Sequence, residues 1–391
     1  MFVTFDGGRK ETWDTLKGQL LGGTLPQAVL FSGPAFSGRM SMILECVRVL
    51  SCHKEGSDEC ACPSCKQFAY STFTNVVAIG NRDYWVRIDA AIANMLRLKT
   101  ELSLKQLYRE LRMMLLQYHP ALLEQADTKE HSLFEAAGAL DEELLQTEIH
   151  SEQQYHMLAK TIASLTKPLR QVRRRSQVSI DQVRALQQWV GQTSLTSSPR
   201  FIILEGMEQS TEGSRNSLLK MLEEPAQKTY IMLLSEHPSR LLPTILSRTQ
   251  HHRIKPFSKE EKNKLLSTLF FVDPEPYPTV EHFIVSQAGI DTAQLQTLAE
   301  QFIRSLDPQQ HLNRGQLEEM GSALEEDRSL KWFLNALALA TKERLNTDHL
   351  PIYRVQNIMS VMQKASFEAT IFNQNNRLFV ESLYYRLLEV V

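Results

Sequence analysis

Four cysteines form the densest group of potential ligands in this sequence. They fall within fourteen residues, at Cys52, Cys60, Cys62 and Cys65. Four thiolates in one short segment are typical of a closed tetrahedral structural zinc site, which has no open position for catalysis. His53 could take the place of one thiolate. Reduced thiols without a metal ion are the alternative, and both interpretations favour a reducing compartment over a disulfide framework.

A glycine-containing loop offers a second kind of chemistry. Gly33 and Gly38 have the spacing of the G-x-x-x-x-G-K-[ST] phosphate loop. Arg39 stands where the motif has its lysine, and Met40 stands where it has the hydroxyl that binds magnesium. A thioether cannot replace a hydroxyl on a hard cation. The loop therefore predicts a nucleotide-binding fold with a silent ATP site. The alternative is a divergent working site in which Arg39 holds the phosphates.

Arg248 is the third candidate for chemistry. Its guanidinium presents five donors in a planar fork, which suits the spread charge of a transferring phosphoryl group better than a lysine does. If Arg248 lies at the end of a short helix, it could act as an arginine finger. The alternative is an ordinary surface arginine.

Apolar runs predict the elements that position these residues. The segments 25–32, 200–204 and 230–235 have the composition of buried strands, and 211–223 has the pattern of a helix. Glu205 follows the second strand, at the carboxyl end where α/β folds place chemistry. Strands alternating with helices predict a parallel sheet.

Two motifs closely resemble those of bacterial DNA polymerase III clamp-loader subunits. Asn216–Pro225 reads NSLLKMLEEP and Leu241–Thr249 reads LLPTILSRT, where that family has NALLKxLEEP and LLPTIxSRC. The resemblance covers roughly residues 1–80 and 177–300. It implies an AAA+ fold, and it implies that Arg248 reaches into the ATP site of a neighbouring subunit.

The resemblance also implies that the chain's own ATP site is silent, as in the delta-prime type of subunit. The family's D-E-A-D segment corresponds to Glu205–Glu208, where Gly206 replaces the glutamate that activates water. No arginine is present near Gly289–Thr292, where the family's sensor arginine is expected. Similar subunits carry a structural zinc module at the place of the cysteines, with spacing C-x8-C-x2-C-x2-C. The spacing here is C-x7-C-x-C-x2-C.

A role follows from the resemblance as an expectation. The chain would be a cytoplasmic, non-hydrolysing subunit of the polymerase III holoenzyme, with ATP bound only in a partner's site. Its partners would be the gamma/tau and delta clamp-loader subunits, the sliding clamp and, through the complex, primer-template DNA. One alternative is a gamma/tau-type subunit that hydrolyses ATP itself. Another is a zinc-containing DNA-binding or scaffold protein.

Composition sets limits on these expectations. The formal net charge is −2, with 43 basic and 45 acidic residues, so a nucleic-acid contact would be a local patch. The basic run Lys167–Arg175 could meet DNA phosphates, although such runs are often solvated faces. No signal peptide is expected at the N-terminus, and no stretch of 18 apolar residues predicts a membrane span.

Changes of pattern predict three domains. Ser258–Glu261 is a capping box that begins a new helix after the sheet domain. Asn373–Leu383 resembles the ending of the family's collar domain, and the apolar positions Val380, Leu383 and Leu387 are explained equally by core packing and by oligomerisation. The expected parts are an AAA+ nucleotide-binding-like domain over 1–256, with a zinc module at about 50–68 and a helical insertion at about 82–175, a helical lid over 257–305, and a helical collar over 306–391.

Overall fold

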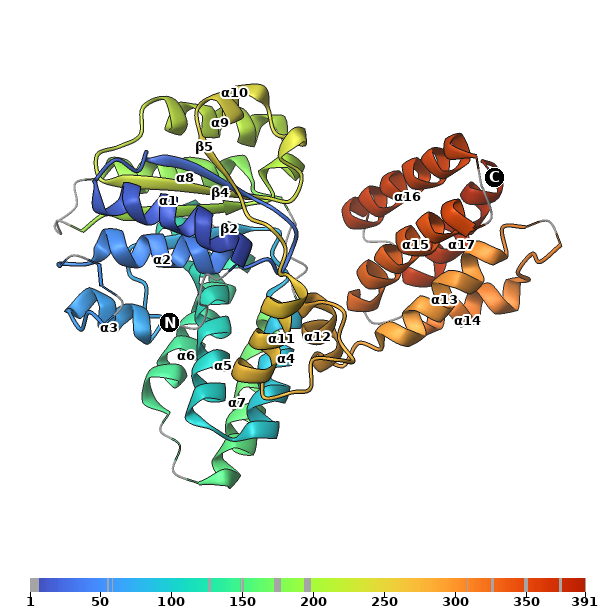
Figure 1. The fold of residues 1–391 in the computed structure, drawn as a ribbon, viewed down its shortest axis with the longest axis horizontal. Coiled ribbons are helices and arrows are strands. Elements are labelled where there is room, and N and C mark those ends of the chain that lie inside the picture. Colours follow the sequence, from blue (N-terminus) through green and yellow to red (C-terminus); the bar gives the residue numbers. More distant parts are fainter. Residues whose placement is uncertain are drawn as a thin grey trace. The chain divides into compact units, whose positions relative to one another are not determined.

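The computed structural model divides the chain into two compact units, Met1–Ala288 and Gly289–Val391 (Figure 1). The residues that the structure describes are 7–54, 56–57, 59–125, 128–147, 149, 151–171, 177–192, 198–307, 309–324, 327–347, 351–372 and 375–390.

A five-stranded parallel sheet forms the centre of the first unit. Its order is β2-β3-β4-β1-β5. The strands are β1 (Ala28–Ser32), β2 (Val76–Gly80), β3 (Arg200–Glu205), β4 (Thr229–Ser235) and β5 (Gln250–Arg253). The three strands expected from sequence are β1, β3 and β4, and the predicted parallel α/β class is confirmed.

Helices cover both faces of this sheet. The helices of the first unit are α1 (Lys10–Leu21), α2 (Arg39–Ser51), α3 (Pro63–Ala69), α4 (Tyr84–Leu98), α5 (Glu101–Leu115), α6 (Thr128–Gln146), α7 (Glu152–Gln171), α8 (Ile180–Gly191), α9 (Glu212–Glu223), α10 (Pro243–Ser247), α11 (Lys259–Leu269) and α12 (Val280–Gln287). Short 3-10 helices lie at Gly7–Arg9, Leu116–Tyr118, Pro120–Gln125, Met207–Gln209 and Pro238–Arg240.

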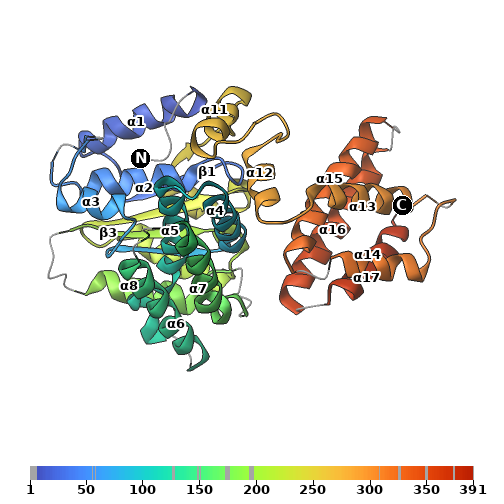
Figure 2. The same ribbon diagram turned by 90° about the horizontal axis from the view of Figure 1, so that it is seen from below.

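Alternate residues of each strand pack into two hydrophobic cores, one on each face of the sheet. Val29 and Phe31 of β1 pack with α1, α2 and α4 to α7, whereas Ala28 and Leu30 pack with α8, α9 and α10. This is the period of two that a strand imposes on its side chains. Figure 1 shows α9 and α10 above the sheet, and Figure 2, seen from below, shows α2, α4 and α5 across its other face. Both faces are therefore buried, as parallel sheets require.

The segment predicted as an insertion, at about residues 82–175, is helical and packs on the sheet; that it is an insertion stays a prediction. Its helices are α4 to α7, and Leu107, Leu111 and Met114 of the expected apolar stripe are buried in the first of the two cores. The insertion also binds the end of α11. Gln106 Nε2 donates to the Leu269 carbonyl at 3.0 Å, and Arg97 donates to the Phe270 carbonyl. These donors satisfy carbonyls that a helix end leaves unpaired.

The capping box predicted at the start of α11 is confirmed. Ser258 Oγ accepts from the Glu261 N–H at 3.2 Å, and the Glu261 carboxylate accepts from the Ser258 N–H at 2.7 Å. Both α11 and α12 belong to the first unit, and the boundary between the two units lies at 288–289. The finer division into lid and collar stays a prediction. Among the described residues, no helix combines the length and apolar character needed to cross a bilayer.

The second unit is helical. Its helices are α13 (Thr292–Arg304), α14 (Arg314–Ala323), α15 (Asp327–Thr347), α16 (Ile352–Phe372) and α17 (Asn376–Leu388). Phe302 meets Phe333 and Tyr384 edge to face, with ring centroids 5.8 and 5.4 Å apart. The predicted apolar face of α17 is fully buried within this unit, through Val380, Leu383 and Leu387. Core packing therefore accounts for that face.

Candidate functional site

The loop with the phosphate-binding spacing lies between β1 and α2. Gly33 follows β1 and donates its N–H to the Ser235 carbonyl of β4 at 3.2 Å. Gly38 is the N-cap of α2, and Arg39 is the first residue of that helix. The strand, loop and helix thus follow the arrangement that cradles phosphates in nucleotide-binding proteins. What differs is the side chain at the lysine position.

Arg39 is buried and paired with carboxylates of the same chain. Its side chain is 4% exposed, and Nη2 lies 3.3 Å from Glu236 Oε1 and 3.6 Å from Glu205 Oε1. Burial lowers the pKa of the guanidinium, while Glu205 and Glu236 act against that shift. The residue at the lysine position is therefore held by internal ion pairs at the end of the sheet.

A second arginine binds the same carboxylate. Arg82 Nε donates to Glu205 Oε2 at 2.9 Å. Burial alone would raise the pKa of Glu205, but Arg82 and Arg39 outweigh it and hold the pKa below its ordinary value. Glu205 is therefore ionised and engaged on both oxygens. The sequence placed Glu205 at the strand end. It predicted neither the contact of Arg82 with Glu205 nor that of Glu236 with Arg39, because the partners come from distant segments.

The backbone at Gly206, the residue that the resemblance aligns with the water-activating glutamate, favours glycine. Gly206 has φ +77°, and a Cβ atom there would lie 2.5 Å from Asn81 Cγ. Such a distance requires Asn81 to move, and a left-handed φ strains any other residue. Ser41, one position beyond the hydroxyl site, accepts a hydrogen bond from Arg109 Nη2 at 3.2 Å.

Arg248 lies on a different element from this cluster. It is the C-cap of α10, and its side chain is 36% exposed. Its Nη2 lies 2.7 Å from Glu223 Oε1, and its Nη1 donates to the Thr244 carbonyl at 3.2 Å. Glu223 is the last residue of α9 and belongs to the LEEP motif. The two motifs that carry the resemblance thus meet through this ion pair, a contact that sequence reasoning missed.

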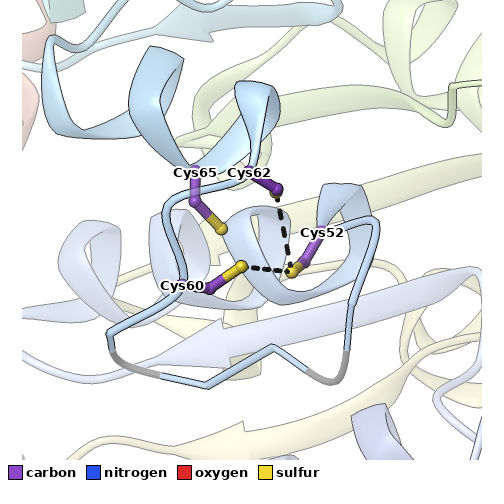
Figure 3. Close-up of side chains that lie close together, drawn as sticks. All are labelled: Cys52, Cys60, Cys62 and Cys65. Atoms are coloured by element: carbon purple, nitrogen blue, oxygen red, sulfur yellow. Dashed lines mark hydrogen bonds between the residues drawn. The ribbon is translucent and has the colours of Figure 1, made fainter.

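The four predicted cysteine ligands converge. Figure 3 shows their side chains pointing toward one another, with Cys52 just after α2 and Cys65 within α3. The Cys52 sulfur lies 3.5 Å from that of Cys60 and 3.9 Å from that of Cys62, and all four sulfurs lie within 4.8 Å of one another. This cluster could hold a metal ion.

Two thiols of the cluster have shifted acidities, and the histidine is not part of it. Burial opposes ionisation of Cys62, but hydrogen bonds from the Cys65 and His53 backbones outweigh it and lower its pKa to about 6. Burial raises the pKa of Cys65 to about 12, so a metal ion would have to displace that proton. The His53 ring bonds Ser64 Oγ at 3.2 Å.

The basic run predicted as a possible DNA contact is described only in part. Arg170 pairs with Asp89 at 2.6 Å and lies 4.3 Å from the Trp85 ring centroid, so it is used within the fold. Lys167 is exposed. Arg173 to Arg175 lie outside the described residues, and the DNA contact stays a prediction.

Comparison with known proteins bears directly on these motifs. A family model described as "DNA polymerase III, delta subunit" matches residues 8–170 and 125–258, more than half of the chain. The chain belongs to the DNA polymerase III delta' subunit family. The family match spans the degenerate loop, the cysteine cluster, the insertion and Arg248.

Individual relatives match shorter segments. The chain is 45% identical over 71 residues to the DNA polymerase III subunit delta' of Pseudomonas aeruginosa, covering 18% of this chain and 22% of that protein. It is 38% identical over 96 residues to the delta' subunit of Bacillus subtilis, covering 25% and 28%. The chain thus spans about a quarter of the length of these curated relatives. Among solved structures, a DNA polymerase III gamma subunit-related protein from Thermotoga maritima matches at 18% identity with a TM-score of 0.25. The match covers 55% of this chain and 80% of the Thermotoga chain.

Proposed function

We propose that this member of the delta' family is the non-hydrolysing subunit of the polymerase III clamp loader, and that it donates Arg248 to the ATP site of a neighbouring subunit. The observation that carries the proposal is the state of Glu205. In an active ATPase the corresponding carboxylate serves the magnesium ion and its water. Here Glu205 is engaged by Arg39 and Arg82.

Three features support a silent ATP site. The residue at the lysine position, Arg39, is bound to acidic side chains. Met40 offers no oxygen to a magnesium ion. Gly206 leaves no carboxylate to activate water, and a larger residue there would adopt a strained left-handed φ and displace the Asn81 side chain. Binding of magnesium-ATP at Glu205 would have to break the largely buried ion pairs of this carboxylate with Arg39 and Arg82, which are costly to open.

The surroundings of Arg248 support a finger. An exposed ion pair such as that with Glu223 contributes about 0–1 kcal/mol, so a phosphate group can displace it at little cost. The Thr244 carbonyl meanwhile holds the guanidinium near the end of α10. Arg248 would therefore enter a partner's site from a partly exposed position that is already ordered at the end of α10, which limits the ordering cost on binding.

The proposed partners follow from this role. They are the gamma/tau and delta subunits, the sliding clamp and, through the complex, primer-template DNA. ATP would be bound in the site that Arg248 completes, within a gamma/tau subunit. Stabilising the charge of the transferring phosphoryl group would then couple clamp and DNA binding to hydrolysis by the partner.

Zinc is the metal that best fits the cysteine cluster. A regular tetrahedron with Zn–S bonds of about 2.3 Å has sulfur atoms about 3.8 Å apart. The distances of 3.5 and 3.9 Å from the Cys52 sulfur lie on either side of that value. Cys52, Cys60, Cys62 and Cys65 would hold the ion. Its role would be structural, because four protein ligands leave no position for a substrate.

The finger is tested by replacing Arg248 in a reconstituted clamp loader. Arg248→Ala should leave folding and assembly intact, since surface pairs contribute little to stability. Fingers are worth about 10³ to 10⁵ in rate at their own site. Other active sites would keep working, so total ATPase should fall partially and clamp loading should fall further. Arg248→Lys should rescue little, because lysine lacks the planar fork.

Arg240→Ala is the matched control, because Arg240 is an exposed arginine eight residues earlier. It should load clamps at the normal rate. Normal loading with Arg248→Ala would instead show that Arg248 is an ordinary surface residue, and the scaffold alternative would take its place. Magnesium-dependent ATP hydrolysis by the isolated chain would favour the gamma/tau-type alternative.

A further inference from the structure

Arg48 connects the cysteine cluster to α2. Its side chain is 12% exposed, and its Nη1 donates to Cys65 Sγ at 3.5 Å. The same nitrogen donates to the Ser57 carbonyl at 3.0 Å, and Nη2 donates to the Gly56 carbonyl at 2.9 Å. One guanidinium thus binds a ligand sulfur and the backbone of the loop that leads to Cys60. No sequence pattern predicted these contacts.

Glu45 fixes the orientation of that guanidinium. Its Oε1 accepts from Arg48 Nε at 2.9 Å and from Arg48 Nη2 at 2.6 Å. The Glu45 side chain is only 9% exposed, and it lies one turn earlier on α2. Because Nε and Nη2 are held by the carboxylate, Nη1 must point toward Cys65 and the loop. This is the fixed fork that distinguishes arginine from lysine.

Backbone packing holds the loop in the same place independently. Gly56 has φ +67°, and a Cβ atom there would lie 2.8 Å from Val49 Cγ1. The loop therefore rests directly on α2, one residue beyond Arg48, at a distance that only glycine allows. Close packing and the Arg48 hydrogen bonds together determine where the loop lies.

We propose that Arg48 is a positioning residue for the metal centre, which it orients and stabilises through Cys65 and the Gly56–Ser57 backbone. This inference rests on the proposed zinc site. A zinc ion with four thiolates has a net charge of −2. A guanidinium that donates to one of the sulfurs offsets part of that charge and holds the sulfur in place. Such outer partners commonly change metal affinity about 10- to 100-fold when they are removed.

The test measures zinc release from the full chain to an excess of a chromogenic chelator. Arg48→Met keeps the apolar stem and removes the donors, and Arg48→Lys keeps the charge without the fork. We expect both to release zinc about 10- to 100-fold faster than the unchanged protein. Lys66→Met is the matched control. It removes an exposed positive charge next to Cys65 and should release zinc at the normal rate.

Cobalt substitution provides a second readout. The sulfur-to-cobalt charge-transfer bands of a tetrathiolate site respond to hydrogen bonds at the sulfur atoms. They should shift in Arg48→Met and remain unchanged in Lys66→Met. A general loss of stability would not move these bands in protein that still binds cobalt. If Arg48→Met does not fold, Glu45→Gln tests the same idea, because it disturbs the orientation of Arg48 and leaves every ligand in place.

The outcomes separate the two proposals. Unchanged protein that contains no zinc and binds no cobalt would overturn the zinc site and the role of Arg48 with it. Unchanged protein that holds zinc, with normal release and normal cobalt bands in the Arg48 variants, would overturn the role of Arg48 alone. Equally fast zinc release from Lys66→Met would also overturn it. Loss of any nearby positive charge would then explain the faster release, without hydrogen bonds from Arg48.

Discussion

At the scale of single residues, the side chain at the lysine position of the loop forms ion pairs within the chain. Arg39 replaces the lysine of the phosphate-loop motif, and its guanidinium binds Glu205 and Glu236 at the end of the sheet. Arg82 completes the arrangement on the other oxygen of Glu205. Burying a carboxylate is tolerated only when charge and hydrogen bonds compensate it. Glu205 is therefore expected to serve stability.

Replacing Glu205 should reveal that contribution and its pH dependence. Glu205→Gln leaves two buried arginines without their shared carboxylate and should cost about 3–5 kcal/mol of unfolding free energy at pH 7. The pKa of Glu205 is lowered in the folded state, so its contribution is present above the ordinary carboxyl pKa. The contribution is lost as the pH falls through the lowered value. Denaturant unfolding at several pH values measures the difference.

Glu275→Gln serves as the control, because Glu275 is an exposed carboxylate of the same unit. It should change stability by less than about 0.5 kcal/mol. A Glu205→Gln variant as stable at pH 7 as this control would contradict the structural role. A loss of unfolding free energy in Glu205→Gln that grows as the pH falls would also contradict it.

At the scale of elements, the helical insertion holds the end of α11. Asn94 Nδ2 donates to Gln106 Oε1 at 2.9 Å, and Gln106 in turn donates to the Leu269 carbonyl. Asn94 is 1% exposed and Gln106 is 9% exposed, so this chain of hydrogen bonds is buried. The insertion therefore does more than enlarge the sheet domain, because it supplies the C-terminal cap of a helix that lies far away in sequence.

Truncating Gln106 should loosen α11 selectively. Gln106→Ala leaves the buried Asn94 amide and the half-buried Leu269 carbonyl without this partner. An unpaired buried polar group costs about 1–3 kcal/mol. Amides in the last turns of α11 should exchange with solvent at least about tenfold faster, since 1.4 kcal/mol corresponds to a factor of ten. Amides of β3 and β4 should change less. Hydrogen exchange resolved by residue makes the comparison.

Lys105→Ala, on the same helix, removes an exposed pair with Glu101 and should leave α11 unchanged. If Gln106→Ala gave the same α11 exchange as this control, the insertion would not be holding the helix.

At the scale of the whole molecule, the two compact units separate the proposed chemistry from the C-terminal helices. The degenerate loop, the cysteine cluster and Arg248 all belong to the first unit. The α2 helix begins at Arg39 and is followed directly by Cys52, so one helix joins the loop after β1 to the cysteine cluster.

The isolated chain should accordingly show no magnesium-dependent ATP hydrolysis. The carboxylate at 205 is engaged by arginines, and Gly206 supplies no group to activate water. Phosphate release from the purified chain measures this directly. A turnover of about 1 per second, lost when Gly38 or Glu205 is changed, would contradict the silent site.

The parallel α/β class, the strands and helices around both family motifs, the capping box at Ser258 and the four candidate cysteine ligands could all be predicted from the sequence. These are local patterns, since apolar periodicity, caps and ligand spacing act over a few residues. Family resemblance supplied the expected role of Arg248, which stays a proposal. Short-range patterns could not decide whether the apolar face of α17 was core or interface, and its burial settled that question for core packing.

The pairing of charged side chains could not be predicted from the sequence and follows from the packing of the elements. Arg39 and Glu236 are 197 residues apart in sequence, and Arg82 and Glu205 are 123 residues apart. The parallel sheet brings them together, because its strands all end at one edge. The pairing of Arg48 with Cys65 likewise depends on how a loop folds back on α2. Such contacts depend on how the elements pack, and no periodic pattern in the sequence predicts them.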